Sequence, residues 1–396
     1  MVRNGTYDIL MYSHDTYGLG HIRRTMAIAS QLIGPEVNIL ILTGSPIVGR
    51  FSFPEQIDFV RIPGMIKKTN EEYLPLSIKI HPQHALSIRK SIITATARTF
   101  RPHLFIVDKE PLGLKREVLP TLHWLKRCFP EARTILGLRD IMDDAATVRQ
   151  DWEDKKVYSA LADLYSEIWV YGNRELYDPI VEYGIPEAVA RKMIFTGYIP
   201  RKTPENDAVR RLKRDQGVAN GERLVVVTTG GGGDGFAVMD TFLAMVEAAA
   251  GRLPFTSLLV TGPFMPRQER RDLAVRARRL GVRILPFVRH MEGLLAAAEL
   301  VVTMGGYNTI CEILTQGKPS LIIPRETPRR EQLLRAQALK RQGLVDFIPW
   351  GECTPATMKE KILRILADPE PFRQAMARFP LTGLDVMRQR LALFRA

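Results

Sequence analysis

The sequence predicts an α/β protein made of two doubly wound domains. Short apolar segments alternate with segments of helical spacing along most of the 396 residues. This alternation stops once, at the glycine- and proline-containing stretch 195–201, and then starts again. Several of the apolar segments run directly into glycine-containing loops. Because strands that alternate with helices form parallel sheets with both faces covered, each half of the chain predicts one such sheet.

The first half contains segments that we interpret as buried parallel strands. The expected strands are residues 7–13, 37–42, 103–108, 133–138 and 168–171. Helical spacing between them predicts helices over residues 22–32, 84–99 and 118–128. We therefore expect residues 1–198 to form one Rossmann-like domain that binds an acceptor.

The second half repeats this pattern after a charged helical stretch at residues 207–215. The expected strands are residues 224–229, 256–261, 283–286, 300–303 and 320–323. We expect residues 199–370 to form a second Rossmann-like domain, and residues 371–396 to form a helical segment that packs back toward the first. Ligands bind at the carboxyl ends of the strands in such sheets, so the expected site is the cleft between two facing domains.

Composition excludes several classes of protein. Hydrophobic residues make up 45% and charged residues 25% of the chain, which is typical of globular domains and excludes wholesale disorder. The three cysteines are widely spaced and contain no Cys-x-x-Cys pair, which argues against a disulfide framework or a zinc knuckle. The sequence has no run of about 18 apolar residues and no cleavable signal pattern. We expect a cytoplasmic protein that does not span a membrane.

The formal net charge of +13 lies mostly in residues 201–396. A run of arginines at residues 267–283 contributes to it, with a spacing that spreads charge around a helix. Such a run is either a solvated helix face or a contact with an anionic surface. It contains no aromatic residue that could stack on bases, which ranks a membrane surface above nucleic acid as a partner.

The loop after the first expected strand contains Gly18 and Gly20 and leads into a helix with His21 and Arg24 near its start. Glycines let the backbone approach a ligand closely, and a helix amino terminus favours an anion. An imidazole titrates near neutral pH, so His21 is a candidate general base for a hydroxyl nucleophile. The alternative is that His21 only caps the helix. Gly18, Gly20 and Arg24 are candidates for contacts with an acceptor.

Acidic residues lie at the ends of two further strands of the first half. Asp108 is the last residue of one expected strand and Glu110 comes shortly after it, and Asp140 follows the next strand. A carboxylate at such a position can orient His21 or bind acceptor hydroxyls, and Asp108 is the first candidate. The alternative for each of them is an exposed loop carboxylate.

The loop at residues 230–235, called the glycine-rich loop below, follows another expected strand. Backbone amides of consecutive glycines can hold a phosphate, and the candidates are Gly231, Gly232 and Gly233. ATP hydrolysis is not indicated, because the Gly-Lys-Ser/Thr of a Walker loop is missing. The alternative is a flexible linker.

A glycine pair, Gly305 and Gly306, separates the strand at residues 300–303 from the next helix. Asn308 and Thr309 lie where side chains and amides can hold phosphate oxygens. About one turn further along, Glu312 can accept two hydrogen bonds from a diol such as that of a ribose. The alternative is an ordinary helix cap.

Taken in order, these motifs resemble glycosyltransferases of the GT-B fold. The order is Gly-x-Gly-His, a glycine-rich loop after the linker, Gly-Gly-x-x-Thr-x-x-Glu, and then Pro followed by Glu-Gln-x-x-Arg-Ala. The family resembled is that of the peptidoglycan-precursor N-acetylglucosaminyltransferase and the plant galactolipid synthases. The resemblance covers the chain in order and is most specific at residues 285–343. Arg335 stands where this family usually has asparagine.

The resemblance implies a nucleotide-sugar donor in the carboxy-terminal domain and an acceptor in the amino-terminal one, with His21 beside the acceptor hydroxyl. Carried over by position, the implied donor contacts are Glu312 at the ribose, Thr309 and residues 231–233 at the diphosphate, Glu331 and Gln332 at the transferred sugar, and Phe287, Val288 and Arg289 at the base.

The sequence therefore predicts an inverting, metal-independent hexosyltransferase that uses a nucleoside-diphosphate sugar, with uridine as the expected base, and a hydroxyl acceptor that can be lipid-linked. No Asp-x-Asp triplet is present, so we expect neither a metal nor another cofactor. We expect the protein in the cytoplasm, peripheral on the inner face of the membrane. Two alternatives stay open: a sugar-nucleotide hydrolase of the same fold, and a non-catalytic nucleotide-binding protein at the membrane surface.

Overall fold

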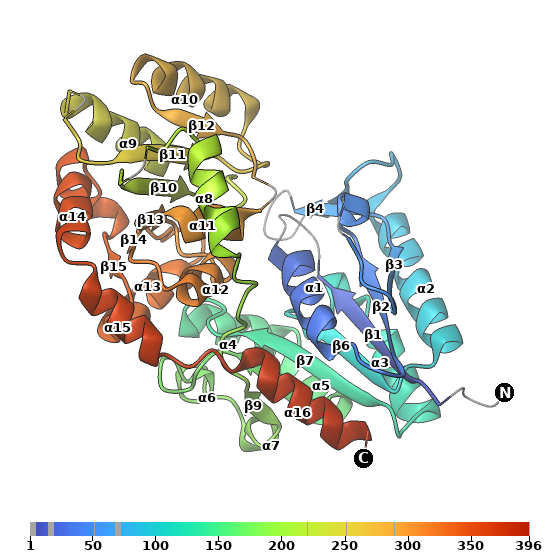
Figure 1. Cartoon of the computed structure of the whole chain (residues 1–396). Coiled ribbons are helices and arrows are strands. Elements are labelled where there is room, and N and C mark those ends of the chain that lie inside the picture. The colour runs from blue at the N-terminus through green and yellow to red at the C-terminus, as the bar shows by residue number, and fades with distance from the viewer. Residues whose placement is uncertain are drawn as a thin grey trace. The chain divides into compact units, whose positions relative to one another are not determined.

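The structure is a computed structural model that describes residues 5–14, 20–50, 52–67, 73–219, 221–250, 252–288 and 290–395. The chain divides into two compact units, which Figure 1 shows. Unit 1 comprises Met1–Asp140, Ala145–Ile199 and Thr382–Ala396, and unit 2 comprises Ile141–Asp144 and Pro200–Leu381. The chain therefore passes from unit 1 into the main part of unit 2 between Ile199 and Pro200. Of the segment 371–396, which we expected to pack toward the first domain, residues 371–381 belong to unit 2 and the rest to unit 1.

Unit 1 is built on a parallel sheet with seven strands among its described residues, in the order β3-β2-β1-β6-β7-β8-β9. These strands are β1 (Tyr7–Ser13), β2 (Val37–Thr43), β3 (Ile57–Arg61), β6 (Leu104–Asp108), β7 (Arg133–Arg139), β8 (Glu167–Tyr171) and β9 (Met193–Phe195). A separate antiparallel pair consists of β4 (Met65–Lys67) and β5 (Tyr73–Pro75). The helices are α1 (Gly20–Leu32), α2 (Pro82–Phe100), α3 (Leu119–Cys128), α4 (Ala145–Asp154), α5 (Val157–Leu164), α6 (Pro179–Glu182), α7 (Glu187–Ala190), α16 (Gly383–Arg395) and the 3₁₀ turns η1 (Val48–Arg50) and η2 (Leu114–Arg116).

The centre of this sheet is apolar because helices cover both faces of its strands. β1 pairs with β2 on one side and with β6 on the other, so that Met11 lies opposite Ile41 and Ile106. Every residue of β6 is buried, and its sequence is a continuous apolar run that ends at Asp108. α16 packs against α1, which is why the last segment of the chain belongs to unit 1.

Unit 2 is built on a parallel sheet with six strands among its described residues, in the order β12-β11-β10-β13-β14-β15. The strands are β10 (Leu224–Thr228), β11 (Thr256–Val260), β12 (Arg283–Leu285), β13 (Leu300–Thr303), β14 (Ser320–Ile322) and β15 (Asp346–Phe347). The helices are α8 (Asn206–Asp215), α9 (Phe236–Ala248), α10 (Arg267–Arg279), α11 (Met291–Ala297), α12 (Tyr307–Gln316), α13 (Glu331–Arg341), α14 (Pro355–Ala367), α15 (Glu370–Arg378) and the 3₁₀ turn η3 (Trp350–Glu352).

One buried core of unit 2 lies between its sheet and the helices α9 and α14. Val227 of β10 pairs with Val302 of β13, and both pack in one buried cluster with Phe242 of α9 and Ile362 of α14. Burying each of these side chains contributes about 1.5–3 kcal/mol to the free energy of unfolding. This core holds the carboxyl ends of β10 and β13 side by side.

The two doubly wound sheets confirm the predicted fold class, and every expected strand is present to within one residue at each end. The strands that the sequence analysis missed are β3, β9 and β15 at the sheet edges and the β4–β5 pair. β3 is partly exposed and the others have two or three residues, so none is a continuous apolar run. Across the described residues, no helix is both long and apolar enough to cross a membrane.

Candidate functional site

Each sheet has one position where the strand order reverses, and most candidate residues gather at these two positions. In unit 1 the reversal lies between β1 and β6, and in unit 2 it lies between β10 and β13. Helices that leave two such neighbouring strands cover opposite faces of the sheet, which opens a crevice at the carboxyl ends of the strands. In folds of this kind, ligands bind at the loops that follow such strands, so these four loops are the candidate sites.

In unit 1, His21 and Asp108 form a hydrogen bond across the β1/β6 position. His21 lies in the first turn of α1, which follows β1, and Asp108 is the last residue of β6. The distance from His21 Nδ1 to Asp108 Oδ2 is 2.5 Å. Asp108 is buried, and the His21 side chain is 14% exposed. Gly20 is the first residue of α1, whereas Gly18 lies in the segment 15–19, outside the described residues.

Arg24, about one turn after His21 on α1, holds the same carboxylate. Its Nε donates to Asp108 Oδ1 over 2.9 Å, and its Nη2 donates to Oδ1 and Oδ2 over 2.6 and 2.8 Å. Burial acts to raise the pKa of Asp108, but Arg24 and His21 together outweigh it and hold this pKa well below its ordinary value. Asp108 is therefore ionised and can only accept hydrogen bonds. The Arg24 guanidinium, a candidate for acceptor contacts, is itself buried against this carboxylate.

The ionised carboxylate determines which nitrogen of His21 carries a proton. Because Asp108 Oδ2 only accepts, Nδ1 must donate, and Nε2 of the neutral ring keeps its lone pair. Burial lowers the pKa of His21 to about 4, although Asp108 acts to raise it. At neutral pH the imidazole is thus neutral, and its Nε2 can act as a base.

His14, which the sequence analysis did not assign, lies beside His21. It follows β1 directly, is buried, and its ring centroid is 5.6 Å from that of His21 in an edge-to-face arrangement. His14 Nδ1 is 3.3 Å from the hydroxyl of Tyr12, which donates to Glu117 over 2.6 Å. Glu117 in turn accepts hydrogen bonds from Arg89. The signal for His14 in the sequence is a histidine at the end of the strand that precedes the loop.

The remaining acidic candidates of unit 1 have other partners. Glu110 forms an ion pair with Lys109 at 3.1 Å. Asp140 is buried and accepts a hydrogen bond from the hydroxyl of Tyr198 over 2.6 Å. Asp108 is therefore the carboxylate that the fold joins to His21.

In unit 2, the glycine-rich loop forms a defined turn between β10 and α9 rather than a flexible linker. Gly232 has a φ of 88°, and a Cβ at this position would lie 2.0 Å from the carbonyl oxygen of Thr261. Only glycine fits there. The carbonyl of Gly231 accepts a hydrogen bond from the N–H of Phe264 over 2.9 Å, and Gly235 is the N-cap of α9. The loop is thus held by the neighbouring β11–α10 connection.

The glycine pair Gly305 and Gly306 adjoins the glycine-rich loop. Gly305 has a φ of 79°, and its Cβ would lie 2.8 Å from Cγ2 of Ile322. Gly306 is the N-cap of α12, and there is open space where its Cβ would be. The Thr309 hydroxyl lies 4.0 Å from the position of a Cβ on Gly230. The amino termini of α9 and α12 therefore follow neighbouring strands, and helix amino termini favour anions such as a diphosphate.

Two candidates on α12 differ in their surroundings. Asn308 Oδ1 accepts a hydrogen bond from Nη2 of Arg201 over 2.6 Å, so this oxygen faces a cation. Glu312, one turn further along, is buried. Arg201, which the sequence analysis did not assign, thus brings a positive charge to the amino terminus of α12. Its only signal in the sequence is its place in the linker.

Glu331 and Gln332, the first two residues of α13, are both bound to Arg325. Nη2 of Arg325 donates to Glu331 Oε1 over 2.5 Å, and the backbone N–H of Arg325 donates to Gln332 Oε1 over 2.9 Å. Nη1 of Arg325 donates to Asp234 of the glycine-rich loop over 2.8 Å. These contacts join the two sugar-binding candidates to the loop expected to hold the diphosphate.

Arg335 has a structural place in unit 2. It is fully buried, and its guanidinium donates to the carbonyl oxygens of Gly305 and Ile141 over 3.2 and 3.3 Å. The guanidinium also lies over the ring of Tyr307, 5.9 Å from its centroid. Arg335 therefore supports the loop before α12 and ties the segment Ile141–Asp144 to unit 2.

The expected base-binding segment follows β12, an edge strand of the unit 2 sheet. Phe287 is 48% exposed, and Val288 is partly buried. Arg289 lies outside the described residues. The exposed ring of Phe287 offers an apolar face of the kind on which a base stacks.

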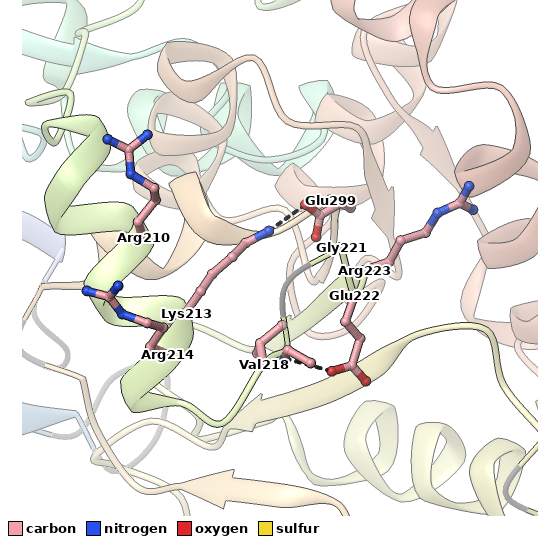
Figure 2. A pocket seen from close by; sticks show the side chains of 9 residues that line it. Arg210, Lys213, Arg214, Val218, Gly221, Glu222, Arg223 and Glu299 are labelled. Carbon is pink, nitrogen blue, oxygen red and sulfur yellow. Dashed lines mark hydrogen bonds and ion pairs between the residues drawn. The ribbon is translucent and has the colours of Figure 1, made fainter.

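A pocket of about 450 Å³ in unit 2 lies at the amino ends of β10 and β13, the opposite edge of the sheet from the candidate loops. Figure 2 shows the Lys213 side chain extending to Glu299, with 2.7 Å between Nζ and Oε1, while the Arg214 guanidinium points away from both. None of the candidate residues lines this pocket. In the described parts of the chain, no group of three or more His, Cys, Asp or Glu side chains could hold a metal ion.

Comparison with known sequences connects the carboxy-terminal half to one family. Residues 225–388 match the glycosyltransferase family 28 C-terminal domain. The chain is 24% identical over 186 residues to the UDP-N-acetylglucosamine--N-acetylmuramyl-(pentapeptide) pyrophosphoryl-undecaprenol N-acetylglucosamine transferase of Clostridioides difficile, covering 47% of this chain and 45% of the relative. It is 36% identical over 87 residues to the transferase of the same name from Streptococcus thermophilus, covering 22% and 24%. The chain spans about half the length, or less, of these curated relatives.

Solved structures share the fold over nearly the whole chain. A UDP-glucosyltransferase from Polygonum tinctorium has a TM-score of 0.67 at 13% identity and covers 99% of both chains. MurG from Acinetobacter baumannii has a TM-score of 0.61 at 11% identity, covering 98% of this chain and 99% of that one. At such identities the likeness shows the fold alone, which is the GT-B fold.

Proposed function

We propose that this chain, which joins the GT-B fold to a glycosyltransferase family 28 C-terminal domain, is an inverting hexosyltransferase that uses a UDP-sugar donor and a hydroxyl acceptor. The observation that supports it most is the His21–Asp108 pair, a neutral imidazole oriented by a buried, ionised carboxylate. The choice of a uridine donor is supported by the names of the relatives, which specify UDP-N-acetylglucosamine. In this proposal unit 1 binds the acceptor and unit 2 binds the donor.

The proposed reaction is a single displacement. The acceptor oxygen forms a bond to the anomeric carbon while the bond from that carbon to the diphosphate oxygen breaks, and UDP leaves with the electron pair. His21 Nε2 takes the proton of the acceptor hydroxyl, and Asp108 stabilises the imidazolium that results. One displacement inverts the configuration at the anomeric carbon.

In this proposal, backbone amides and helix amino termini of unit 2 stabilise the negative charge that develops on UDP. The glycine-rich loop and the first turn of α12 adjoin, since the hydroxyl of Thr309 in that turn lies 4.0 Å from the position of a Cβ on Gly230. Preorganised donors aimed at a developing charge are worth about 2.7–4 kcal/mol each in known enzymes. Glu312 is assigned to the ribose, Glu331 and Gln332 to the transferred sugar, and Phe287 to the base. Metal independence is part of the proposal, and the missing Asp-x-Asp triplet supports it.

The acceptor is proposed to be lipid-linked and the protein to lie on the cytoplasmic face of a membrane. The names of the relatives include an undecaprenol-linked acceptor. α10 carries arginines on its exposed side, including Arg267, Arg271 and Arg278, which suits an anionic lipid surface.

The decisive test is a donor screen followed by product analysis. Thermal shift with UDP, UDP-N-acetylglucosamine, UDP-glucose and UDP-galactose should identify the donor, because a ligand at 100 times its Kd stabilises a protein by about 2.7 kcal/mol. Products formed with and without hydroxyl acceptors then separate a transferase from a hydrolase that uses water. We expect an inverted glycoside, formed equally well in the presence of a metal chelator. Binding without turnover would leave a non-catalytic nucleotide-binding protein.

A further inference from the structure

Arg325 occupies a central place among the donor-side candidates, although no motif assigned it. It lies three residues beyond the end of β14, at the same edge of the sheet as the glycine-rich loop and Gly305. Its side chain is 25% exposed, whereas Glu331 and Gln332 are almost fully buried. This cation is therefore partly exposed to solvent while it contacts buried groups.

The guanidinium binds carboxylates from two separate loops. Nη1 donates to Asp234 Oδ2 over 2.8 Å, and Nη2 donates to Glu331 Oε1 over 2.5 Å. A planar guanidinium donates in directions that are fixed relative to one another, so it holds both carboxylates in one geometry. Its Nε is buried and has no hydrogen-bond acceptor within the described part of the chain.

The backbone of Arg325 determines the orientation of the Gln332 amide. The N–H of Arg325 can only donate, so the amide atom facing it over 2.9 Å must be the oxygen. The oxygen of Gln332 is thereby committed, and its NH₂ group is the part left to bind a ligand. One residue thus orients both of the adjacent side chains at the start of α13.

We propose that Arg325 is a positioning residue for the transferred sugar, which holds Glu331 and Gln332 in register with the glycine-rich loop. This inference rests on the proposed function, because it needs a nucleotide-sugar in unit 2. Glu331 then presents a carboxylate whose place is set by a cation, and Gln332 presents amide donors to the hydroxyls of the sugar. The guanidinium acts through Glu331 and Asp234, and these are the contacts that a substitution of Arg325 removes. The backbone N–H acts through Gln332, and a substituted residue keeps it. Neither group binds the diphosphate in this proposal.

The proposal predicts that Arg325→Leu affects the sugar and spares the nucleotide. Calorimetry on the purified full chain should compare Kd for UDP with Kd for each of UDP-N-acetylglucosamine, UDP-glucose and UDP-galactose. We expect Kd for the UDP-sugar that the wild type binds best to rise at least tenfold more than Kd for UDP. Arg325→Lys should give a smaller change of the same kind, because a single ammonium cannot hold two carboxylates in fork geometry. This second variant also covers the case in which Arg325→Leu does not fold.

The matched control is Arg276→Leu. Arg276 also joins two carboxylates, those of Asp240 and Glu247, and has similar exposure, but it lies on α10 away from the candidate loops. Arg276→Leu should lower the Tm by about as much as Arg325→Leu does. It should keep the wild-type ratio of Kd for the UDP-sugar to Kd for UDP.

Two results would overturn the proposal for Arg325. One is a folded Arg325 variant with the wild-type ratio of Kd values, and the other is an equal loss for UDP and UDP-sugar, which would mean contact with the diphosphate. A wild-type protein that binds neither UDP nor any UDP-sugar would overturn the proposed function as well, and that failure is visible without any variant.

Discussion

The two units carry their candidate residues at the same topological position but in different chemical form. At the β1/β6 position of unit 1, the candidate groups are side chains, namely the partly buried His21 and the buried Arg24 and Asp108. At the β10/β13 position of unit 2, glycine loops and the amino termini of α9 and α12 bring backbone to the site. A proton transfer needs one atom with a defined protonation state, whereas a diphosphate needs several donors at once. In the proposed function, one fold used twice thus serves two tasks through its loops.

This comparison separates the effects of substitutions. Changes in the unit 1 side chains should alter the rate of the chemical step and leave donor binding intact. Changes in unit 2 should alter the affinity for the donor.

The largest expected effect is that of His21→Ala. Loss of a general base should lower turnover by roughly 100- to 10,000-fold while Kd for the donor stays nearly unchanged. A lost helix cap would instead cost about 1 kcal/mol of stability and leave much of the rate. Steady-state kinetics and calorimetry on His21→Ala and on the exposed-histidine control His84→Ala measure both quantities. Retained turnover in a folded His21→Ala protein would move the base assignment to Asp108 or Asp140.

Gly232→Ala tests whether the glycine-rich loop binds through its backbone. A side chain at a φ of 88° is strained by about 1–3 kcal/mol, and its Cβ would meet the Thr261 carbonyl oxygen, so the loop has to move. We expect a lower Tm and at least tenfold weaker binding of UDP. Gly351→Ala is the control, because open space surrounds that position. Unchanged UDP affinity in Gly232→Ala would separate this loop from the donor.

Glu312→Ala should weaken UDP binding about tenfold or more, because the ribose loses charge-assisted hydrogen bonds worth about 1.5–3 kcal/mol. Calorimetry with UDP measures the change, and the exposed Glu360→Ala on α14 is the control. The assignment of Glu312 to the ribose is wrong if the variant binds UDP as well as the wild type does.

The pH profile sharpens the account of unit 1. His21 acts as a base only when neutral, and burial lowers its pKa to about 4. Activity should therefore stay level as pH falls from 8 through the ordinary imidazole value near 6.5, and fall only as pH approaches 4. The dependence of kcat/KM on pH between 4.5 and 8 checks this. A fall in kcat/KM centred near pH 6.5 would contradict this account, because it would mean that the His21 imidazole is more solvated than in the structure.

The smallest expected effect concerns the positive charge of residues 201–396. Sedimentation with anionic vesicles should fall as salt rises, because each arginine near such a surface contributes about 1 kcal/mol and salt screens it. Replacing Arg271 and Arg278 on α10 with glutamine should weaken the binding to anionic vesicles at a given salt concentration. Equal binding to neutral vesicles, or no binding to either kind, would remove lipid from the expected partners.

Sequence patterns were sufficient for the parts of the fold that repeat locally. β6 and β10 are wholly buried runs, and each is followed by the loop that its residues predicted. β3 was missed because it is partly exposed and so is not a continuous apolar run. β15 was missed because its two residues are too few to show a pattern of apolar and polar residues. The candidates His21 and Asp108 were found separately, since His21 comes after one predicted strand and Asp108 ends another.

By itself the sequence determined which residues end strands, which loops consist of glycine and which side chains can take a proton, because these properties depend on neighbours in the chain. Only the tertiary structure decided that Arg24 and His21 meet Asp108, which is 84 and 87 residues away, and that Arg325 joins Asp234 across 91 residues. It also decided the pKa of His21, because desolvation depends on what covers the ring. Pairing and burial are properties of distance in space, and no local pattern encodes them.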